Sequence, residues 1–120
     1  MKADASLWAK QKCKACEGGA LERLDAKQAQ EWLAALPRWS LAAEGKRLRR
    51  EWRVKDFLTA LEFFRLVGEL AEQEGHHPDL HLVGYRNVTI EIWTHALGGL
   101  SENDFILAAK IDTLPVELKS

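Results

Sequence analysis

The run from Phe57 to about Glu74 constrains the fold most, because it predicts one long helix that must bury a broad apolar face. Asp56 stands before it as an N-cap residue, and Gly75 follows as a residue that can end the helix with a positive φ. Apolar side chains recur at helical spacing along the run and form a wide face. They are Phe57, Ala60, Leu61, Phe64, Val67 and Ala71, flanked by Phe63, Leu66 and Leu70. We expect this helix to be central to the core and its face to suit contact with a partner subunit.

Two pairs of short strands flank this helix. Residues 39–43 and 47–54 form the first pair, with a turn at Gly45, and residues 80–83 and 87–94 form the second. Helical patterns at about 25–35 and 101–111 complete the order. Strands joined by tight turns pair antiparallel. The predicted fold is therefore α+β, a two-layer sandwich with three helices packed on one face of a four-stranded antiparallel sheet.

Two residues depart from the alternation of these strands. Trp93 lies among the alternate positions of the last strand that point away from the core, so it either covers the second face of the sheet or lies in a subunit contact. Arg50 shares the core-facing positions of its strand with Leu48 and Trp52, which suggests that it lies near an edge of the sheet. The four arginines of 47–53 could suit nucleic acid, but a solvated sheet face is favoured because no aromatic or glycine pattern accompanies them.

The length of 120 residues suits one domain, predicted at residues 20–120, behind a polar and frayed arm at residues 1–19. The net charge of −1 gives no basic field for nucleic acid or a membrane surface. No apolar run approaches the roughly 18 residues of a spanning helix, and the N-terminus lacks a signal-peptide core. We expect a cytoplasmic protein.

Cys13 and Cys16 form a CxxC motif in the predicted arm. A structural zinc ion needs four ligands, and the chain has no second CxxC. A redox CxxC normally starts a helix after a strand, whereas these flanks are polar and glycine-rich. Reduced thiols in the arm are favoured; a metal site shared between subunits and redox activity stay open.

All four histidines fall between Glu72 and Asp104: His76, His77, His81 and His95. Histidine has an unperturbed pKa of about 6.5, so it can donate or accept a proton near neutrality. This concentration predicts a proton-transfer site that the rest of the chain holds in place.

The places of three histidines support this prediction. His76 and His77 follow a helix end, whose partial negative charge favours an imidazolium, and Pro78 imposes an extended backbone after them. Adjacent side chains in an extended segment point opposite ways, so one faces a cleft. His95 ends a strand close to Gly98, where a cleft commonly opens.

A metal site is the first alternative. The four histidines with Glu72, Asp79 or Asp104 could supply nitrogen and oxygen ligands. The spacing is not that of HExxH, and Pro78 prevents His77 and His81 from sharing a helical face. We expect no metal.

The two acidic residues also have structural interpretations. Asp104 stands three residues after Ser101, which is a capping-box position. Glu72 stands four residues before His76 on the same helical face, where it could hold that histidine or remain a solvated surface residue.

Several motifs together resemble the pterin-4a-carbinolamine dehydratase family. They are Glu72 to Pro78 with its HHP, Tyr85, the strand Val88 to Thr94 ending in His95, and Gly99 to Asp104, with Leu36-Pro37-x-Trp39 and Lys55-Asp56-Phe57 upstream. The resemblance covers about residues 24–112. The stretch between His77 and His95 is one residue longer than in the animal enzymes, and the CxxC arm lies outside the animal pattern.

The resemblance implies a dehydratase that converts a 4a-hydroxytetrahydropterin to quinonoid dihydropterin and water, recycling the pterin cofactor of aromatic amino acid hydroxylation. It implies no metal or organic cofactor and a homodimer or homotetramer. The family's catalytic residues map onto His76, His77 and His95 with Asp104 as acidic partner. Glu72 and Trp39 correspond to substrate-binding positions, and the Trp39 ring could stack on the pterin.

The family also implies a rival function. In animals it serves as a dimerisation cofactor for a homeodomain transcription factor, through the helical surface that forms its tetramer. The apolar face of the 57–74 helix would suit such docking. The enzyme is favoured because the chain has no nuclear signal or basic arm.

Overall fold

The computed structural model describes residues 3–14 and 21–120. Its elements follow the predicted order, with two short additions. The helices are α1 (Ala5–Trp8), α2 (Ala26–Leu33), α3 (Phe57–Glu74), η1 (His95–Leu97) and α4 (Glu102–Ile111), and the strands are β1 (Ser40–Ala42), β2 (Arg47–Arg53), β3 (Asp79–Val83) and β4 (Asn87–Ile92).

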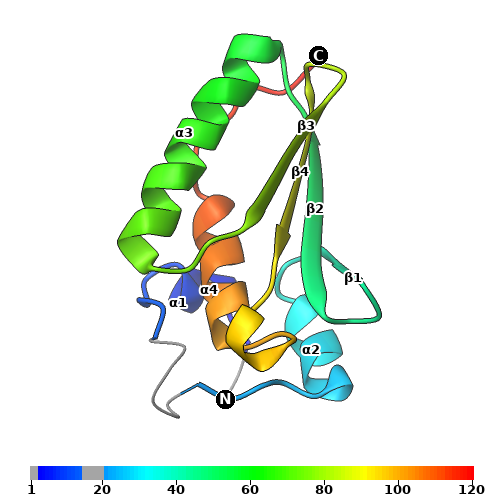
Figure 1. Ribbon diagram of the computed structural model, residues 1–120, viewed down its shortest axis with the longest axis vertical. Coiled ribbons are helices and arrows are strands. Elements are labelled where there is room, and N and C mark those ends of the chain that lie inside the picture. Colours follow the sequence, from blue (N-terminus) through cyan, green and yellow to red (C-terminus); the bar gives the residue numbers. More distant parts are fainter. Residues whose placement is uncertain (1–2, 15–20) are drawn as a thin grey trace.

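The four strands form one antiparallel sheet in the order β1-β2-β4-β3. In Figure 1 the helices α3 and α4 lie along one side of this sheet, and α2 lies near β1 at its lower end. The predicted α+β sandwich with a four-stranded antiparallel sheet is confirmed. Among the described residues, no helix combines the length and apolar character of a membrane-spanning segment.

Alternation in the strands produces the core. Leu48 and Trp52 of β2 and Ile90 and Ile92 of β4 are buried against the helical layer, while the opposite parity carries charged side chains. Arg50 lies just beyond the end of β1, which pairs only as far as Arg49. Its guanidinium stacks over the Trp52 ring at 4.3 Å, so its aliphatic stem is covered while its charge is paired.

The central helix has the predicted bounds but a rotated buried face. Ala60, Phe63, Val67 and Ala71 are its buried residues. Residues expected at the centre of the stripe lie outside: Phe57 is 47% exposed and Leu61 43% exposed. The apolar face is wider than the sheet can cover, so part of it faces solvent.

The expectation of a frayed arm is wrong for residues 3–14. Asp4 caps α1 by accepting a hydrogen bond from the Ser6 backbone N–H at 2.9 Å. Trp8 is 1% exposed and packs between Trp32 and Phe105, with ring centroids 5.6 and 5.3 Å away. Cys16 lies outside the described residues, so the expectations for the CxxC pair stay predictions.

Candidate functional site

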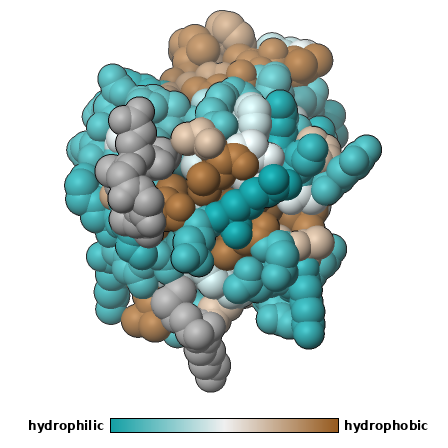
Figure 2. All heavy atoms as spheres, turned by 60° about the horizontal axis from the view of Figure 1, so that its bottom comes forward, coloured by the Kyte–Doolittle hydropathy of each residue, from teal (hydrophilic) through white to brown (hydrophobic). Residues whose placement is uncertain are grey.

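A cavity of about 370 Å³ lies where α3 ends and β4 runs into η1. The end of α3 and the segment after β4 both lie in the lower half of the molecule as drawn in Figure 1. Figure 2 turns this end toward the viewer and shows a mostly hydrophilic surface with apolar residues gathered at its centre and along its upper edge. The cavity is lined by Gly75, His76, His77, Trp93, His95 and Ala96. Three of the four histidines therefore meet at one place.

The backbone at Gly75 turns His76 into the protein. Gly75 has φ of 67° and ends α3 in the left-handed conformation, which glycine adopts without steric cost. His76 is 5% exposed, and its Nε2 lies 2.7 Å from Oδ1 of Asp104, which is 0% exposed. A carboxylate can only accept hydrogen bonds, so Nε2 of His76 is the donor when it faces the carboxylate form of Asp104.

Two further groups hold Asp104 in place. The Ser101 backbone N–H donates to Oδ2 at 2.8 Å, and the Thr94 hydroxyl donates to the same oxygen at 2.9 Å. Thr94 Oγ1 also lies 2.7 Å from Ser101 Oγ. Because the single hydroxyl hydrogen of Thr94 goes to Asp104, Ser101 is the donor in that contact. Asp104 thus closes the predicted capping box of α4 and also contacts His76, while its part in catalysis stays a prediction.

His77 also lines the cavity but is exposed, whereas its neighbour His76 is buried. Its Nε2 lies 2.5 Å from Oε2 of Glu72, and the two side chains are 62% and 77% exposed. Glu72 thus lies exposed beside His77, while the turn at Gly75 takes His76 away from the surface of α3. Exposed pairs of this kind contribute little to stability.

Trp93 forms the aromatic wall of the cavity beside His95. The two ring centroids are 4.1 Å apart and the planes are inclined by 31°. The Arg47 guanidinium lies 4.7 Å from the Trp93 ring centroid and donates to Glu91 at 2.9 Å. The sequence analysis did not assign Trp93 to the site. Its spacing of two from His95 was the available signal, since residues i and i+2 of an extended strand face the same side.

Trp39 and His81 are not among the residues that line this cavity. Trp39 is 3% exposed, donates from Nε1 to Oδ1 of Asp112 at 2.9 Å and packs edge-on against Trp52. Its predicted stacking on a ligand does not fit this place in the core. His81 is exposed on β3, paired in register with Thr89.

A metal centre gains no support from the part of the chain that is described. Within residues 3–14 and 21–120, no three His, Cys, Asp or Glu side chains are grouped as ligands for a metal ion.

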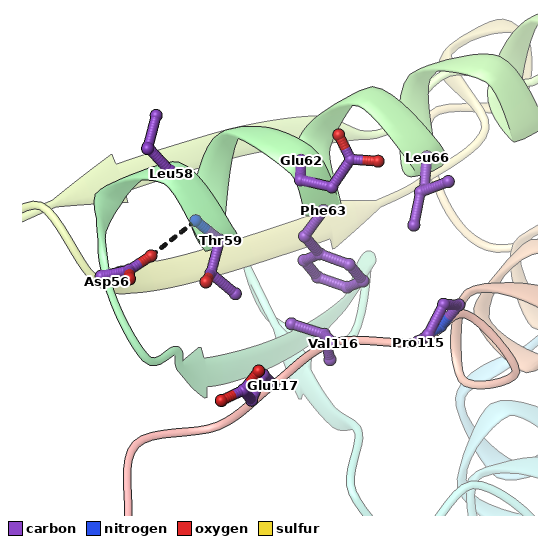
Figure 3. Close-up of a pocket in the computed structure, with 9 residues that line it drawn as sticks. All are labelled: Asp56, Leu58, Thr59, Glu62, Phe63, Leu66, Pro115, Val116 and Glu117. Atoms are coloured by element: carbon purple, nitrogen blue, oxygen red, sulfur yellow. Dashed lines mark hydrogen bonds between the residues drawn. The ribbon is translucent and has the colours of Figure 1, made fainter.

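A larger hollow than the histidine cavity lies elsewhere. A groove of about 870 Å³ runs between the first half of α3 and the C-terminal segment, where Figure 3 shows Phe63 and Leu66 facing Pro115 and Val116. Its Asp56 is engaged as the N-cap of α3, accepting from the Thr59 backbone N–H at 2.8 Å. No histidine lines this groove. The larger hollow and the histidine cavity are therefore separate.

Comparison with known proteins points to one family. The model of the family described as pterin 4 alpha carbinolamine dehydratase matches residues 22–114. A relative named pterin-4-alpha-carbinolamine dehydratase 2, mitochondrial, from Arabidopsis thaliana is 55% identical over 108 residues, which cover 88% of this chain and 58% of that protein. The chain thus spans little more than half of that relative.

Two further relatives are covered over nearly their whole length. A provisionally named pterin-4-alpha-carbinolamine dehydratase of Methylococcus capsulatus is 47% identical over 93% of this chain and 96% of its own. The crystal structure of a transcriptional coactivator/pterin dehydratase from Brucella melitensis has a TM-score of 0.70 and 31% identity, covering 76% of this chain and 96% of its own. With three histidines at one cavity and these matches, the chain belongs to the pterin-4a-carbinolamine dehydratase family.

Proposed function

We propose that this protein dehydrates a 4a-hydroxytetrahydropterin to the quinonoid dihydropterin, with histidines as acid and base. The observation that carries the proposal is the meeting of His76, His77 and His95 at one cavity walled by Trp93. A volume of about 370 Å³ falls within the range of small-molecule sites, roughly 300–1,000 Å³. Family membership supports the substrate class.

The reaction needs little more than well-placed proton transfer. The C4a–OH bond breaks as the lone pair of the neighbouring ring nitrogen forms the C=N bond, and that nitrogen loses its proton. An acid must protonate the leaving hydroxyl, and a base must take the proton from nitrogen. Such general acid–base help is typically worth about 10²–10⁴-fold.

The three histidines differ in a way that suits a division of labour. His76 is buried beside Asp104, whereas His77 and His95 are exposed at the cavity, where a ligand can reach them. We assign His77 and His95 to the reacting carbon, with His76 assisting and Asp104 orienting His76. Glu72 is assigned to hold His77, and the Trp93 ring to contact the flat face of the pterin.

The test is the double replacement of His77 and His95 by Ala. We expect kcat for a synthetic carbinolamine to fall by about 10²–10⁴-fold while the fold persists, because both side chains are exposed. His81→Ala is the matched control, since His81 is exposed on β3 and lies outside the cavity lining. Near-wild-type turnover in the double variant would refute the assignment.

We also infer that the chain self-associates as a homodimer or homotetramer. The inference is supported by apolar side chains left uncovered at the start of α3: Phe57 is 47% exposed, Leu58 75% and Leu61 43%. A cluster of this kind is typical of an interaction surface. The change Leu58→Lys should lower the mass measured by light scattering, and an unchanged mass would contradict the inference.

A second candidate function uses the same surface. The Brucella melitensis relative is named a transcriptional coactivator as well as a pterin dehydratase. Binding another protein through Phe57, Leu58 and Leu61 would leave turnover unaffected, so a pull-down of a partner by a chain without dehydratase activity would favour this candidate. Recycling of a hydroxylase cofactor and a cytoplasmic location remain predictions; the Arabidopsis thaliana relative is named mitochondrial.

A further inference from the structure

The N-terminal segment lies outside the residues that the family model matches, yet its described part is anchored in the core. Trp8 fills a place between Trp32 of α2 and Phe105 of α4. Figure 1 shows α1 lying beside the lower half of α4. From this anchor, residues 12–14 run to the region of the His76–Asp104 pair, where they make a set of specific contacts.

The first contact fixes the start of α4. The Lys14 backbone N–H donates to Oδ1 of Asn103 at 2.8 Å, and Nδ2 of Asn103 donates back to the Lys14 carbonyl at 2.7 Å. Asn103 is 0% exposed and directly precedes Asp104. Its side-chain amide therefore ties the residue next to the carboxylate to the N-terminal segment. Lys14 Nζ adds an ion pair with Glu102 at 2.6 Å.

The second contact fixes the end of α3. The Cys13 backbone N–H donates to Oε1 of Glu74 at 2.8 Å, and Lys110 donates to Oε2 of the same carboxylate at 2.8 Å. Lys12 Nζ donates to the Gln73 carbonyl at 2.7 Å, where a cation complements the helix C-terminus. Glu74 stands two residues before His76.

We propose that residues 12–14 act as a clasp that sets the His76–Asp104 hydrogen bond, with Asn103 and Glu74 as positioning residues. One short segment holds the end of α3, just before the histidine, and the start of α4, just before the carboxylate. The inference rests on the proposed function. Displacement of a catalytic group by about 1 Å can cost roughly 10²-fold in rate, so a clasp of this kind would control turnover without touching substrate.

The principal test is Asn103→Ala, with Asn87→Ala as the matched control on exposed β4 backbone remote from the clasp. Two readouts are needed: steady-state kinetics, and the NMR resonance of the His76 ring Nε2–H, whose hydrogen bond to a buried carboxylate shifts it downfield. We expect kcat to fall about 10–100-fold with KM changed less than threefold, and the resonance to shift or vanish through exchange. The control should match the wild type in both.

Circular dichroism establishes whether Asn103→Ala folds. If it does not fold, the kinetics and the His76 resonance are measured on Lys14→Pro instead. Proline at position 14 lacks the backbone N–H that donates to Oδ1 of Asn103, so it removes the same contact from its exposed partner. A folded variant with kcat within twofold of wild type, or with an unchanged His76 resonance, overturns the clasp. A wild-type protein that fails to dehydrate the carbinolamine overturns the proposed function instead, and the resonance still tests whether the clasp positions His76.

Discussion

Replacing Asp104 by Asn tests the buried network that orients His76. The carboxylate is 0% exposed and receives three donors: His76 Nε2 at 2.7 Å, the Ser101 N–H at 2.8 Å and the Thr94 hydroxyl at 2.9 Å. The amide of Asn has one accepting oxygen. If that oxygen keeps Ser101 and Thr94, its NH₂ group faces Nε2 of His76, and the imidazole must take the other tautomer to accept.

The magnitude follows from the loss of one charge-assisted hydrogen bond in a buried place, about 1.5–3 kcal/mol. For a chain of this length, 1 kcal/mol corresponds to roughly 4 °C, so we expect Tm to fall by about 6–12 °C. We expect kcat to fall by about 10²-fold, because the proton of His76 moves to the wrong nitrogen.

The assays are thermal unfolding by circular dichroism and steady-state dehydration. Asp56→Asn is the matched control: Asp56 caps α3 at the surface, and Asn caps a helix about as well as Asp. A Tm within 2 °C of wild type together with kcat within threefold would refute the role given to Asp104.

Three further predictions concern groups near the site. Burial, with the nearby Glu74 carboxylate, raises the pKa of the Cys13 thiol to about 12. Iodoacetamide at pH 8 should therefore label Cys13 at least tenfold more slowly in the native protein than in denaturant, as measured by peptide mass spectrometry. Equal labelling rates would contradict the burial of Cys13. Burial acts to raise the pKa of Glu74, but hydrogen bonds from Lys110 and the Cys13 N–H and the Lys110 charge outweigh it and lower that pKa below its ordinary value of 4.5. The ionised Glu74 carboxylate stabilises the folded state above pH 4.5, and this contribution is lost as the pH falls through the lowered pKa. Glu74→Gln should therefore lower the free energy of unfolding by about 1–2 kcal/mol at pH 7 and by less at pH 3, as measured by guanidinium titration. A loss of unfolding free energy that does not change with pH would contradict this role of Glu74. Trp93→Ala should raise KM about fivefold with a smaller change in kcat, and an unchanged KM would exclude a contact with substrate.

The sequence predicted the elements whose signals are local. The bounds of α3 follow from Asp56 and Gly75, because a cap and a left-handed turn act within a few residues. The alternation of β4 placed Ile90 and Ile92 in the core for the same reason. The family motifs located the three histidines that meet at the cavity.

The errors arose where a contact distant in sequence decides the outcome. The short helix α1 has too few turns for periodicity to appear, and the burial of Trp8 depends on Phe105, far along the chain. The i,i+4 rule offered His76 as a partner of Glu72 beside a solvated position, but that rule ceases to apply once Gly75 ends the helix, and Glu72 lies exposed beside His77. The place of Trp39 likewise depends on a residue far along the chain, because its buried ring donates from Nε1 to the carboxylate of Asp112.

A structure determined with a bound dihydropterin tests the central claim most directly. We predict that the bicyclic ring lies in the cavity at the end of α3, against Trp93 and within hydrogen-bonding distance of His77 and His95. A ring seated in the groove between α3 and the C-terminal segment, or away from all three imidazoles, would contradict the account.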